Sequence, residues 1–318
     1  MFRVICRLAM AFLILIIFFF LLGLTGCGQR QQYRKVRLSV DSPNAIEYNS
    51  PSSSKSGRAP LRVAIAPVIS PKETIRSYDE FLTYLSAKLE RPVELIQRQT
   101  YAEVNDLVRS GHIDVALVCT RAYVEGKRDF DMELLVAPQV QGQAVYYSYL
   151  IVPLDSEAQS LEDLRGKTFA FSDPMSTSGR LVPVYRLWQM GETPESFFKK
   201  YIYTYSHDNS MKAVAAKLVD GAAVDSLVYD YALARGFQYI ARTKIIWKSP
   251  PYGAPPIVVH PRLNSELKTQ LRDVFLTMDQ DEEGRRILQD LMIDRFVVID
   301  DAAYDSIREM IASLGHQG

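Results

Sequence analysis

Three consecutive hydroxyl side chains stand where a predicted strand gives way to a helix. An Asp-Pro turn follows the strand predicted at Thr168 to Phe171, and Ser176, Thr177, Ser178 and Gly179 then open the next element. The first N–H groups of a helix lack partners inside it and carry the positive end of its dipole, while hydroxyls add donors without adding charge. The segment favours binding of a small anion; the alternative is an ordinary helix cap followed by spare serines.

Two further polar segments also lie between a predicted strand and a helix. His207 could donate to an oxyanion beside a helix N-terminus, with Asp208 capping that helix, although a structural hydrogen bond is the plainer role for His207. Asp225 ends the short strand at 222–224. Its carboxylate could accept a hydrogen bond from a protonated oxyacid, or it could simply cap the strand end.

Short apolar runs alternate with amphipathic helical segments from Leu61 onward, which predicts an α/β fold with crossover helices. Ser77 and Glu80 have the spacing of a capping box and predict a helix over 78–90. Thr100 and Glu103 have the same spacing and predict a helix after the strand at 93–97.

The alternation restarts after Pro153, which predicts a second lobe inserted into the first. Extended crossings near Ser148 to Pro153 and Pro250 to His260 would join the two lobes and act as a hinge. The expected division is 61–150 for the first part of lobe 1, 151–250 for lobe 2, and 251–318 for the return to lobe 1 with C-terminal helices.

The first residues have the pattern of an export signal. Arg3 and Arg7 precede the apolar run at 8–22, and Leu24-Thr25-Gly26-Cys27 follows. A signal anchor that stays in the membrane is one interpretation. The favoured one is a signal peptide over 1–26, because the four residues ending at Cys27 resemble the bacterial lipoprotein signal, in which that cysteine receives the lipid.

Residues 27–60 are rich in Gln, Ser, Asn and Arg and are expected to form a flexible tether. A lipid anchor on Cys27 would place the protein on the periplasmic or other extracytoplasmic face of a bacterial membrane. There the available partners are small solutes, envelope polymers and other proteins.

Composition excludes several classes of function. The 318 residues are 47% hydrophobic, and 37 Lys plus Arg balance 37 Asp plus Glu, so electrostatic attraction to nucleic acid is not expected. Three cysteines and four scattered histidines provide no closely spaced metal cage, and neither a metal nor a cofactor is expected.

An envelope enzyme acting on a phosphate ester is the catalytic alternative. Cys119 ends a predicted strand and could be called a nucleophile, but a buried cysteine more often packs as a small apolar residue. The sequence contains no G-x-S-x-G elbow, phosphate-binding G-x-x-x-x-G-K-[ST] loop or H-E-x-x-H motif. We therefore expect a binding protein and not an enzyme.

Taken together, these segments resemble the phosphate, phosphite and phosphonate receptors of ABC importers. The resemblance covers about Leu61 to Val259 and rests on Ser176-Thr177-Ser178-Gly179, His207-Asp208, Gly221–Asp225, Tyr78 to Leu85, Tyr101, Gly111–Ala116 and Ala122-Tyr123. It implies a two-lobed periplasmic-binding-protein fold of the second type that closes on a tetrahedral oxyanion.

The resemblance also implies roles for individual residues. The family's hydroxyl ligands correspond to Ser176, Thr177 and Ser178, its histidine to His207, its acidic ligand to Asp225 and its first-lobe tyrosine to Tyr101. Thr120 follows a strand and is a weaker candidate, and one of Tyr146, Tyr147 and Tyr149 could line the cleft.

One departure from the family pattern bears on the ligand. Receptors that recognise an alkyl amine place an acidic residue before the return crossing, and 249–254 contains none, so an aminoalkyl phosphonate is not favoured. The implied partner is an ABC permease. The alternative is a membrane sensor kinase to which the same fold would report its ligand.

Overall fold

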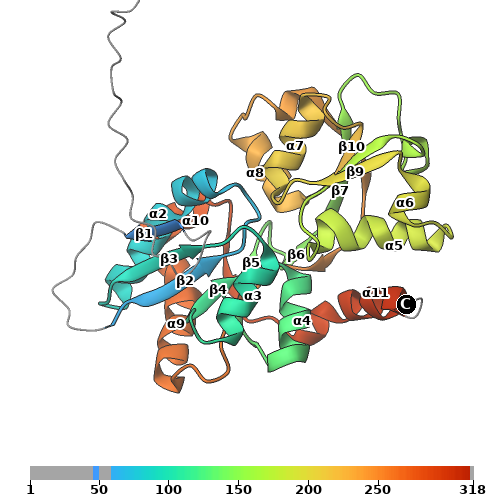
Figure 1. The fold of residues 1–318 in the computed structure, drawn as a ribbon. Helices are drawn as coiled ribbons and strands as arrows, with labels where there is room; N and C mark the ends of the chain where they lie inside the picture. The colour runs from blue at the N-terminus through green and yellow to red at the C-terminus, as the bar shows by residue number, and fades with distance from the viewer. Residues whose placement is uncertain (1–45, 50–58, 316–318) are drawn as a thin grey trace, which may run out of the picture. The chain divides into compact units, whose positions relative to one another are not determined.

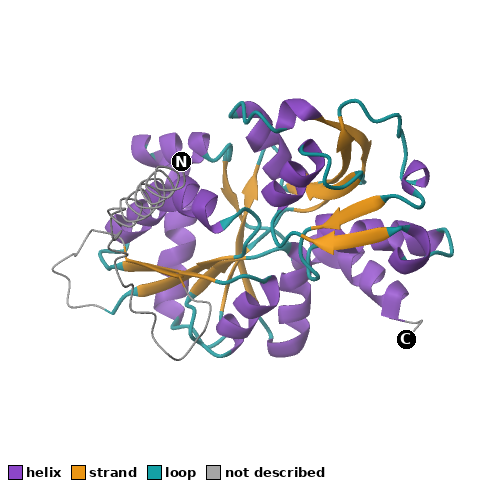
Figure 2. Ribbon diagram, turned by 45° about the horizontal axis from the view of Figure 1, so that its top comes forward, coloured by secondary structure: helices purple, strands orange, loops and turns teal. Residues whose placement is uncertain are grey.

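Two β-sheets organise the part of the chain that the computed structural model describes, residues 46–49 and 59–315. Each sheet is flanked by helices and forms the centre of one lobe (Figures 1 and 2). The predicted α/β alternation is therefore confirmed in both lobes. Within these residues, no helix combines the length and the apolar character needed to cross a membrane. The predicted signal peptide at 1–26 and the predicted lipidation site, Cys27, lie outside the described residues.

The first lobe contains a seven-stranded mixed sheet. Its order is β1 (Ile46–Asn49), β3 (Val93–Gln97), β2 (Leu61–Ile65), β4 (Val115–Leu117), β13 (Ile257–Val259), β5 (Glu133–Gln139) and β14 (Arg295–Val297). The lobe also holds α2 (Pro71–Lys88), α3 (Tyr101–Arg109), α4 (Thr120–Phe130), α9 (Ser265–Thr277) and α10 (Glu282–Asp290). Phe81, Phe275 and Phe296 pack together in its core, with ring centroids 5.2 to 6.2 Å apart.

The second lobe contains a five-stranded sheet. Its order is β11 (Thr243–Lys248), β7 (Ser148–Pro153), β10 (Gly221–Asp225), β8 (Thr168–Phe171) and β9 (Lys200–Tyr203). Its helices are α5 (Val182–Gln189), α6 (Pro194–Phe197), α7 (His207–Ala215) and α8 (Ser226–Ala234). Phe169 of β8 stacks on Phe198 with a centroid separation of 4.4 Å, which anchors the strand that leads into the hydroxyl segment.

The chain crosses between the lobes at a short antiparallel ladder. β6 (Val145–Tyr146) pairs with β12 (Tyr252–Gly253). The prediction of a crossing at Ser148 to Pro153 is wrong, because these residues form β7, which lies between β10 and β11 in the second sheet. α11 (Asp305–Gly315) contacts both α4 and α5, so the C-terminal helix packs on both lobes (Figure 1).

The local signals predict some boundaries correctly and others not. The Thr100–Glu103 capping box is confirmed, since Thr100 Oγ1 accepts from Glu103 N at 3.2 Å and Glu103 Oε2 accepts from Thr100 N at 2.9 Å. The start predicted near Ser77 is wrong, because α2 begins at Pro71, whose fixed φ suits a first helical turn.

Part of the segment expected to be a tether is ordered in the sheet. Ile46–Asn49 forms β1 and pairs antiparallel with β3. The apolar and aromatic residues that alternate in this short run suit an edge strand, a signal that the surrounding polar composition obscured.

Candidate functional site

The hydroxyl segment forms a single π-helical turn, Thr177–Leu181, that leads from β8 toward α5. Ser176 stands at the start of this turn, and its Oγ accepts the N–H of Gly179 at 3.0 Å. Its hydroxyl therefore caps the turn, which is the structural role that was the alternative for this residue.

Thr177 joins the second lobe to the first. Its Oγ1 accepts the N–H of Arg121 at 2.9 Å and lies 2.7 Å from Thr120 Oγ1. Thr120 Oγ1 in turn lies 2.8 Å from the hydroxyl of Tyr146, which belongs to the crossing strand β6. Thr120, Thr177 and Tyr146 thus form one chain of hydrogen bonds between the lobes.

Four buried hydroxyls lack a hydrogen-bond partner among the described residues, those of Ser178, Tyr101, Ser172 and Ser206, and the first two belong to predicted ligand residues. Both side chains are buried, and neither Ser178 Oγ nor Tyr101 Oη has a hydrogen-bond partner within residues 46–49 and 59–315. Burial, with the nearby Cys119, Asp173 and Asp225, raises the pKa of Tyr101 well above its usual value, so the phenol keeps its proton. An unsatisfied buried hydroxyl costs about 1–3 kcal/mol, so these two groups call for an acceptor.

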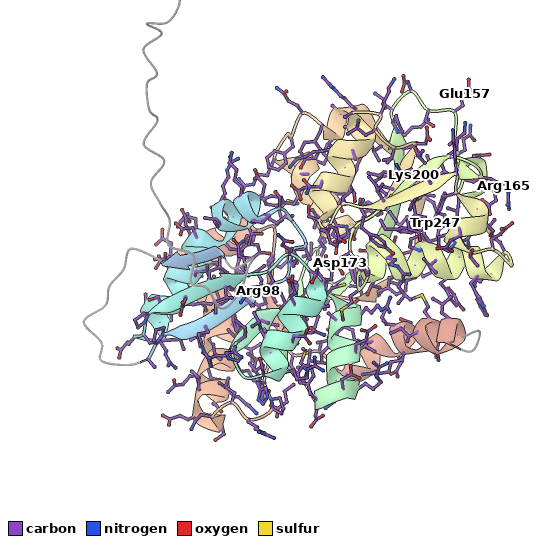
Figure 3. All side chains as sticks on the ribbon, in the orientation of Figure 1. Arg98, Glu157, Arg165, Asp173, Lys200 and Trp247 are labelled. Atoms are coloured by element: carbon purple, nitrogen blue, oxygen red, sulfur yellow. The ribbon has the colours of Figure 1, made fainter. Side chains whose placement is uncertain are left out.

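The backbone holds Tyr101 against the second lobe. Its N–H donates to Asp173 Oδ2 at 3.2 Å, and Asp173 Oδ1 accepts the N–H of Met175 at 2.7 Å. Figure 3 labels Asp173 where α3 meets the loop that follows β8. This carboxylate therefore positions both the tyrosine and the start of the hydroxyl segment.

His207 is the first residue of α7 and is held as a neutral ring. Its Nδ1 accepts the N–H of Asp225 at 3.1 Å, which leaves the proton on Nε2 as a donor. Burial lowers the pKa of His207 to about 4, although the charge of Asp208 acts in the opposite direction. The ring lies beside Gly179, where an added Cβ would overlap the Ser172 side chain and come within 3.0 Å of His207 Cε1. Gly179 therefore allows the close approach of these groups.

Asp225 ends β10 and caps α8. Its Oδ1 accepts the N–H groups of Leu227 at 2.7 Å and Val228 at 3.4 Å, so the capping role considered for it is present. Burial raises the pKa of Asp225 to about 7, against the hydrogen bonds that stabilise its charged form. Near neutral pH this side chain can accept a proton from an oxyacid or donate one to an oxyanion.

The prediction that Asp208 caps its helix is wrong. Its Oδ1 accepts the N–H of Ser70 at 2.8 Å, its Oδ2 accepts the hydroxyl of Ser70 at 2.8 Å, and Lys212 Nζ lies 2.6 Å from Oδ2. Nearby, His207 N donates to the carbonyl of Val68 at 2.9 Å. The N-terminus of α7 is thus hydrogen-bonded to the first lobe through Asp208 and His207. Sequence spacing could not reveal this contact.

A cleft of about 390 Å³ adjoins this site and is lined by both lobes. Among the seven predicted ligand residues, Asp225 lines the cleft, while Ser176, Thr177, Ser178, His207, Tyr101 and Thr120 lie in the packed contact beside it. Tyr147 and Tyr149 line the cleft, and Tyr146 does not.

Sequence reasoning missed Asp230, which lies in α8 five residues after the N-cap Asp225 and also lines the cleft. No sequence signal pointed to it, since no helix was predicted over 226–234 and a spacing of five does not place two residues on the same helical face. Its Oδ2 accepts the hydroxyl of Tyr149 at 3.2 Å.

Neutral donors dominate this arrangement, with one titratable carboxyl beside them. Such a set can replace the hydration shell of an oxyanion without supplying a nucleophile. Burial raises the pKa of the Cys119 thiol, and Thr177 N donates to its Sγ at 3.3 Å. Since the thiolate is the reactive form, this cysteine is an inert packing residue.

Comparisons with known proteins identify the family of the chain. The family model for ABC transporter, phosphonate, periplasmic substrate-binding protein matches residues 63–304. The chain is 28% identical to the phosphonates-binding periplasmic protein of Escherichia coli over 243 residues, 75% of this chain and 72% of that one. It is 27% identical to a phosphate-import protein of Mycolicibacterium smegmatis over 277 residues, 81% of this chain and 86% of that one.

Solved structures show the same two-lobed fold. A binding-protein component of an ABC phosphonate transporter from Pseudomonas aeruginosa superposes with a TM-score of 0.75 at 28% identity, covering 80% of this chain and 86% of that one. A Prochlorococcus marinus protein in complex with methylphosphonate gives a TM-score of 0.73 at 23% identity, covering 80% of this chain and 98% of that one. The chain belongs to the family of periplasmic substrate-binding proteins of phosphonate ABC transporters.

Proposed function

We propose that this protein binds a phosphorus oxyanion (phosphate, phosphite or a phosphonate) at the contact between its lobes and delivers it to an ABC permease. The observation that carries the proposal is that two predicted ligand residues, Ser178 of the second lobe and Tyr101 of the first, hold buried hydroxyls without partners among the described residues. A tetrahedral oxyanion would accept from both, and from His207 Nε2, while Asp225 would share a proton with it.

Binding requires the lobes to separate and close again. The predicted hydroxyl residues are buried, so a ligand reaches them only when the lobes turn about the β6–β12 crossing. The contacts from Thr177 to Thr120 and from Asp208 to Ser70 then close around the ligand. Ligand binding and lobe closure would thus stabilise each other.

The oxyanion assignment is tested by thermal unfolding of the full chain in lipid nanodiscs, which accommodate its apolar first segment. Phosphate, phosphite and methylphosphonate are added separately, with sulfate as a control for ionic strength. A ligand at one hundred times its dissociation constant stabilises the folded protein by about 2.7 kcal/mol, a shift of about 2–4 °C for a chain of this size. An unchanged melting temperature with all three phosphorus oxyanions would count against the assignment.

We also propose that a lipid on Cys27 anchors the receptor to the extracytoplasmic face of the membrane. The sequence Leu24-Thr25-Gly26-Cys27 supports this proposal. In a bacterial host, labelled palmitate should enter the wild-type protein and not Cys27→Ser. Equal labelling of the two proteins would show that the acyl group is not on this cysteine.

A further inference from the structure

The cleft beside the oxyanion residues is much larger than a simple tetrahedral anion. Its volume is about 390 Å³, and Asp225 belongs both to its wall and to the proposed oxyanion site. One water molecule takes about 30 Å³ of liquid volume, and a methylphosphonate has only five heavy atoms. Clefts of about 300–1,000 Å³ usually hold organic molecules of drug size. The cleft therefore meets the proposed oxyanion site at Asp225, and its volume is suited to a larger substituent.

The walls of the cleft are apolar and aromatic on both sides. The first lobe contributes Val68, Ile69, Tyr78, Val140, Met292 and Ile293, and the second contributes Tyr147, Tyr149, Leu227, Val228 and Tyr231. Aromatic and aliphatic walls favour apolar groups, since each square ångström of apolar surface removed from water stabilises the complex by about 25 cal/mol.

Three of the polar groups in these walls interact with other residues of the protein. Asp230 accepts the hydroxyl of Tyr149 at 3.2 Å, and Lys248 Nζ lies 3.5 Å from the ring centroid of Tyr147. Ser226 Oγ accepts the N–H of Tyr147 at 2.9 Å. The charge of Lys248 also acts on Asp230, so the two opposite charges on this wall offset each other. A charged substituent would therefore meet both signs of charge on this wall.

We propose that the ligand of this receptor is a phosphonate or phosphate monoester with an uncharged apolar substituent about the size of an aromatic ring. The inference rests on the proposed function, because the oxyanion must occupy the hydroxyl site for its substituent to extend past Asp225 into the cleft. Lobe closure would then place the substituent between Val228 on the second lobe and Ile293 on the first.

An aminoalkyl phosphonate is the competing ligand. Its ammonium group could approach Asp230, but it would also meet the charge of Lys248 on the same wall and would bury less apolar surface. An aminoalkyl phosphonate is therefore included in the experiment as the competing ligand.

The experiment is isothermal titration of the full chain in lipid nanodiscs with phosphate, methylphosphonate, benzylphosphonate and 2-aminoethylphosphonate. Full burial of a side chain as large as phenylalanine contributes enough to predict that benzylphosphonate binds about 10- to 100-fold more tightly than methylphosphonate. The amine should bind no more tightly than methylphosphonate.

A variant that fills the cleft distinguishes the contribution of the substituent to affinity from that of the oxyanion. Val228→Trp should abolish the advantage of benzylphosphonate and leave methylphosphonate within about threefold of its wild-type affinity. The matched control is Leu233→Trp, on the same helix but 58% exposed and outside the cleft. Ile293→Trp, from the opposite wall, repeats the test if Val228→Trp does not fold.

The outcomes distinguish this inference from the function on which it rests. Tight binding of small oxyanions with weaker benzylphosphonate binding, or with the amine as the best ligand, overturns the inference and keeps the function. An advantage for benzylphosphonate that survives both cleft variants also overturns it. If none of the four compounds binds and phosphite also leaves the melting temperature unchanged, the proposed function itself fails.

Discussion

Replacing Tyr101 with phenylalanine should stabilise the unliganded protein and weaken its binding of oxyanions. The Tyr101 hydroxyl is buried without a partner among the described residues, so its removal relieves a cost of about 1–3 kcal/mol in the free energy of unfolding. A hydrogen bond to a charged ligand is worth about 1.5–3 kcal/mol, so affinity should fall about 10- to 150-fold. A substitution that raises stability and lowers affinity identifies a hydroxyl kept for a ligand.

Urea unfolding without ligand and titration with phosphate or methylphosphonate measure the two effects. Tyr304→Phe is the matched control, because Tyr304 is equally buried but its hydroxyl donates to the carbonyl of Ala254 at 2.9 Å. That variant should lose about 1 kcal/mol of stability and keep its affinity. If Tyr101→Phe is destabilised like Tyr304→Phe and binds as well as wild type, the Tyr101 hydroxyl does not bind the ligand.

Asp225→Asn and His207→Gln should change the pH dependence of stability in opposite directions. Burial raises the pKa of Asp225 from 3.8 to about 7, so the unfolded chain loses this proton first and the contribution to stability falls as pH rises from 4 to 7. Burial lowers the pKa of His207 from 6.5 to about 4, so only the unfolded chain takes up this proton and stability rises from pH 4 to 6.5.

Each whole step in pKa corresponds to about 1.4 kcal/mol, so the two groups contribute roughly 4 and 3 kcal/mol and nearly cancel in the wild type. Relative to wild type, the free energy of unfolding of Asp225→Asn should rise by about 4 kcal/mol between pH 4 and 7. The amide oxygen of the asparagine can still cap α8. The free energy of unfolding of His207→Gln should fall by about 3 kcal/mol relative to wild type between pH 4 and 6.5. Urea midpoints measured at several pH values test this, and curves parallel to wild type would show that neither group titrates as its burial implies.

The sequence predicted what depends on near neighbours. Alternating short apolar runs and amphipathic segments indicated two α/β lobes, and the capping box at Thr100 and Glu103 marked the start of α3. The strand Thr168–Phe171 was predicted with its observed bounds, and the hydroxyl segment does begin a helical turn after it. These features arise from hydrogen bonds and side-chain periodicity within a few residues, so the order of residues alone specifies them.

Contacts between residues far apart in the chain changed other boundaries. Ser70 does not cap α2, because its hydroxyl donates to Asp208 of the other lobe, and α2 begins at Pro71, before the Ser77 capping signal. The crossing was predicted at Ser148–Pro153 but lies at β6, because the residues of β7 pair with β10 and β11. Neither pairing leaves a pattern within a local window of sequence.

Only the tertiary structure decided which hydroxyl is available to a ligand. The three similar side chains are adjacent in the sequence but have different partners. The Ser176 hydroxyl accepts the N–H of Gly179, and the Thr177 hydroxyl is hydrogen-bonded to Thr120 and Arg121 of the first lobe. Of the three, only the Ser178 hydroxyl lacks a partner among the described residues. The sequence determined that donors would gather at this turn, because backbone geometry there is local. Their separate roles depend on a surface supplied by residues more than fifty positions away, which comes into contact only when the two lobes meet.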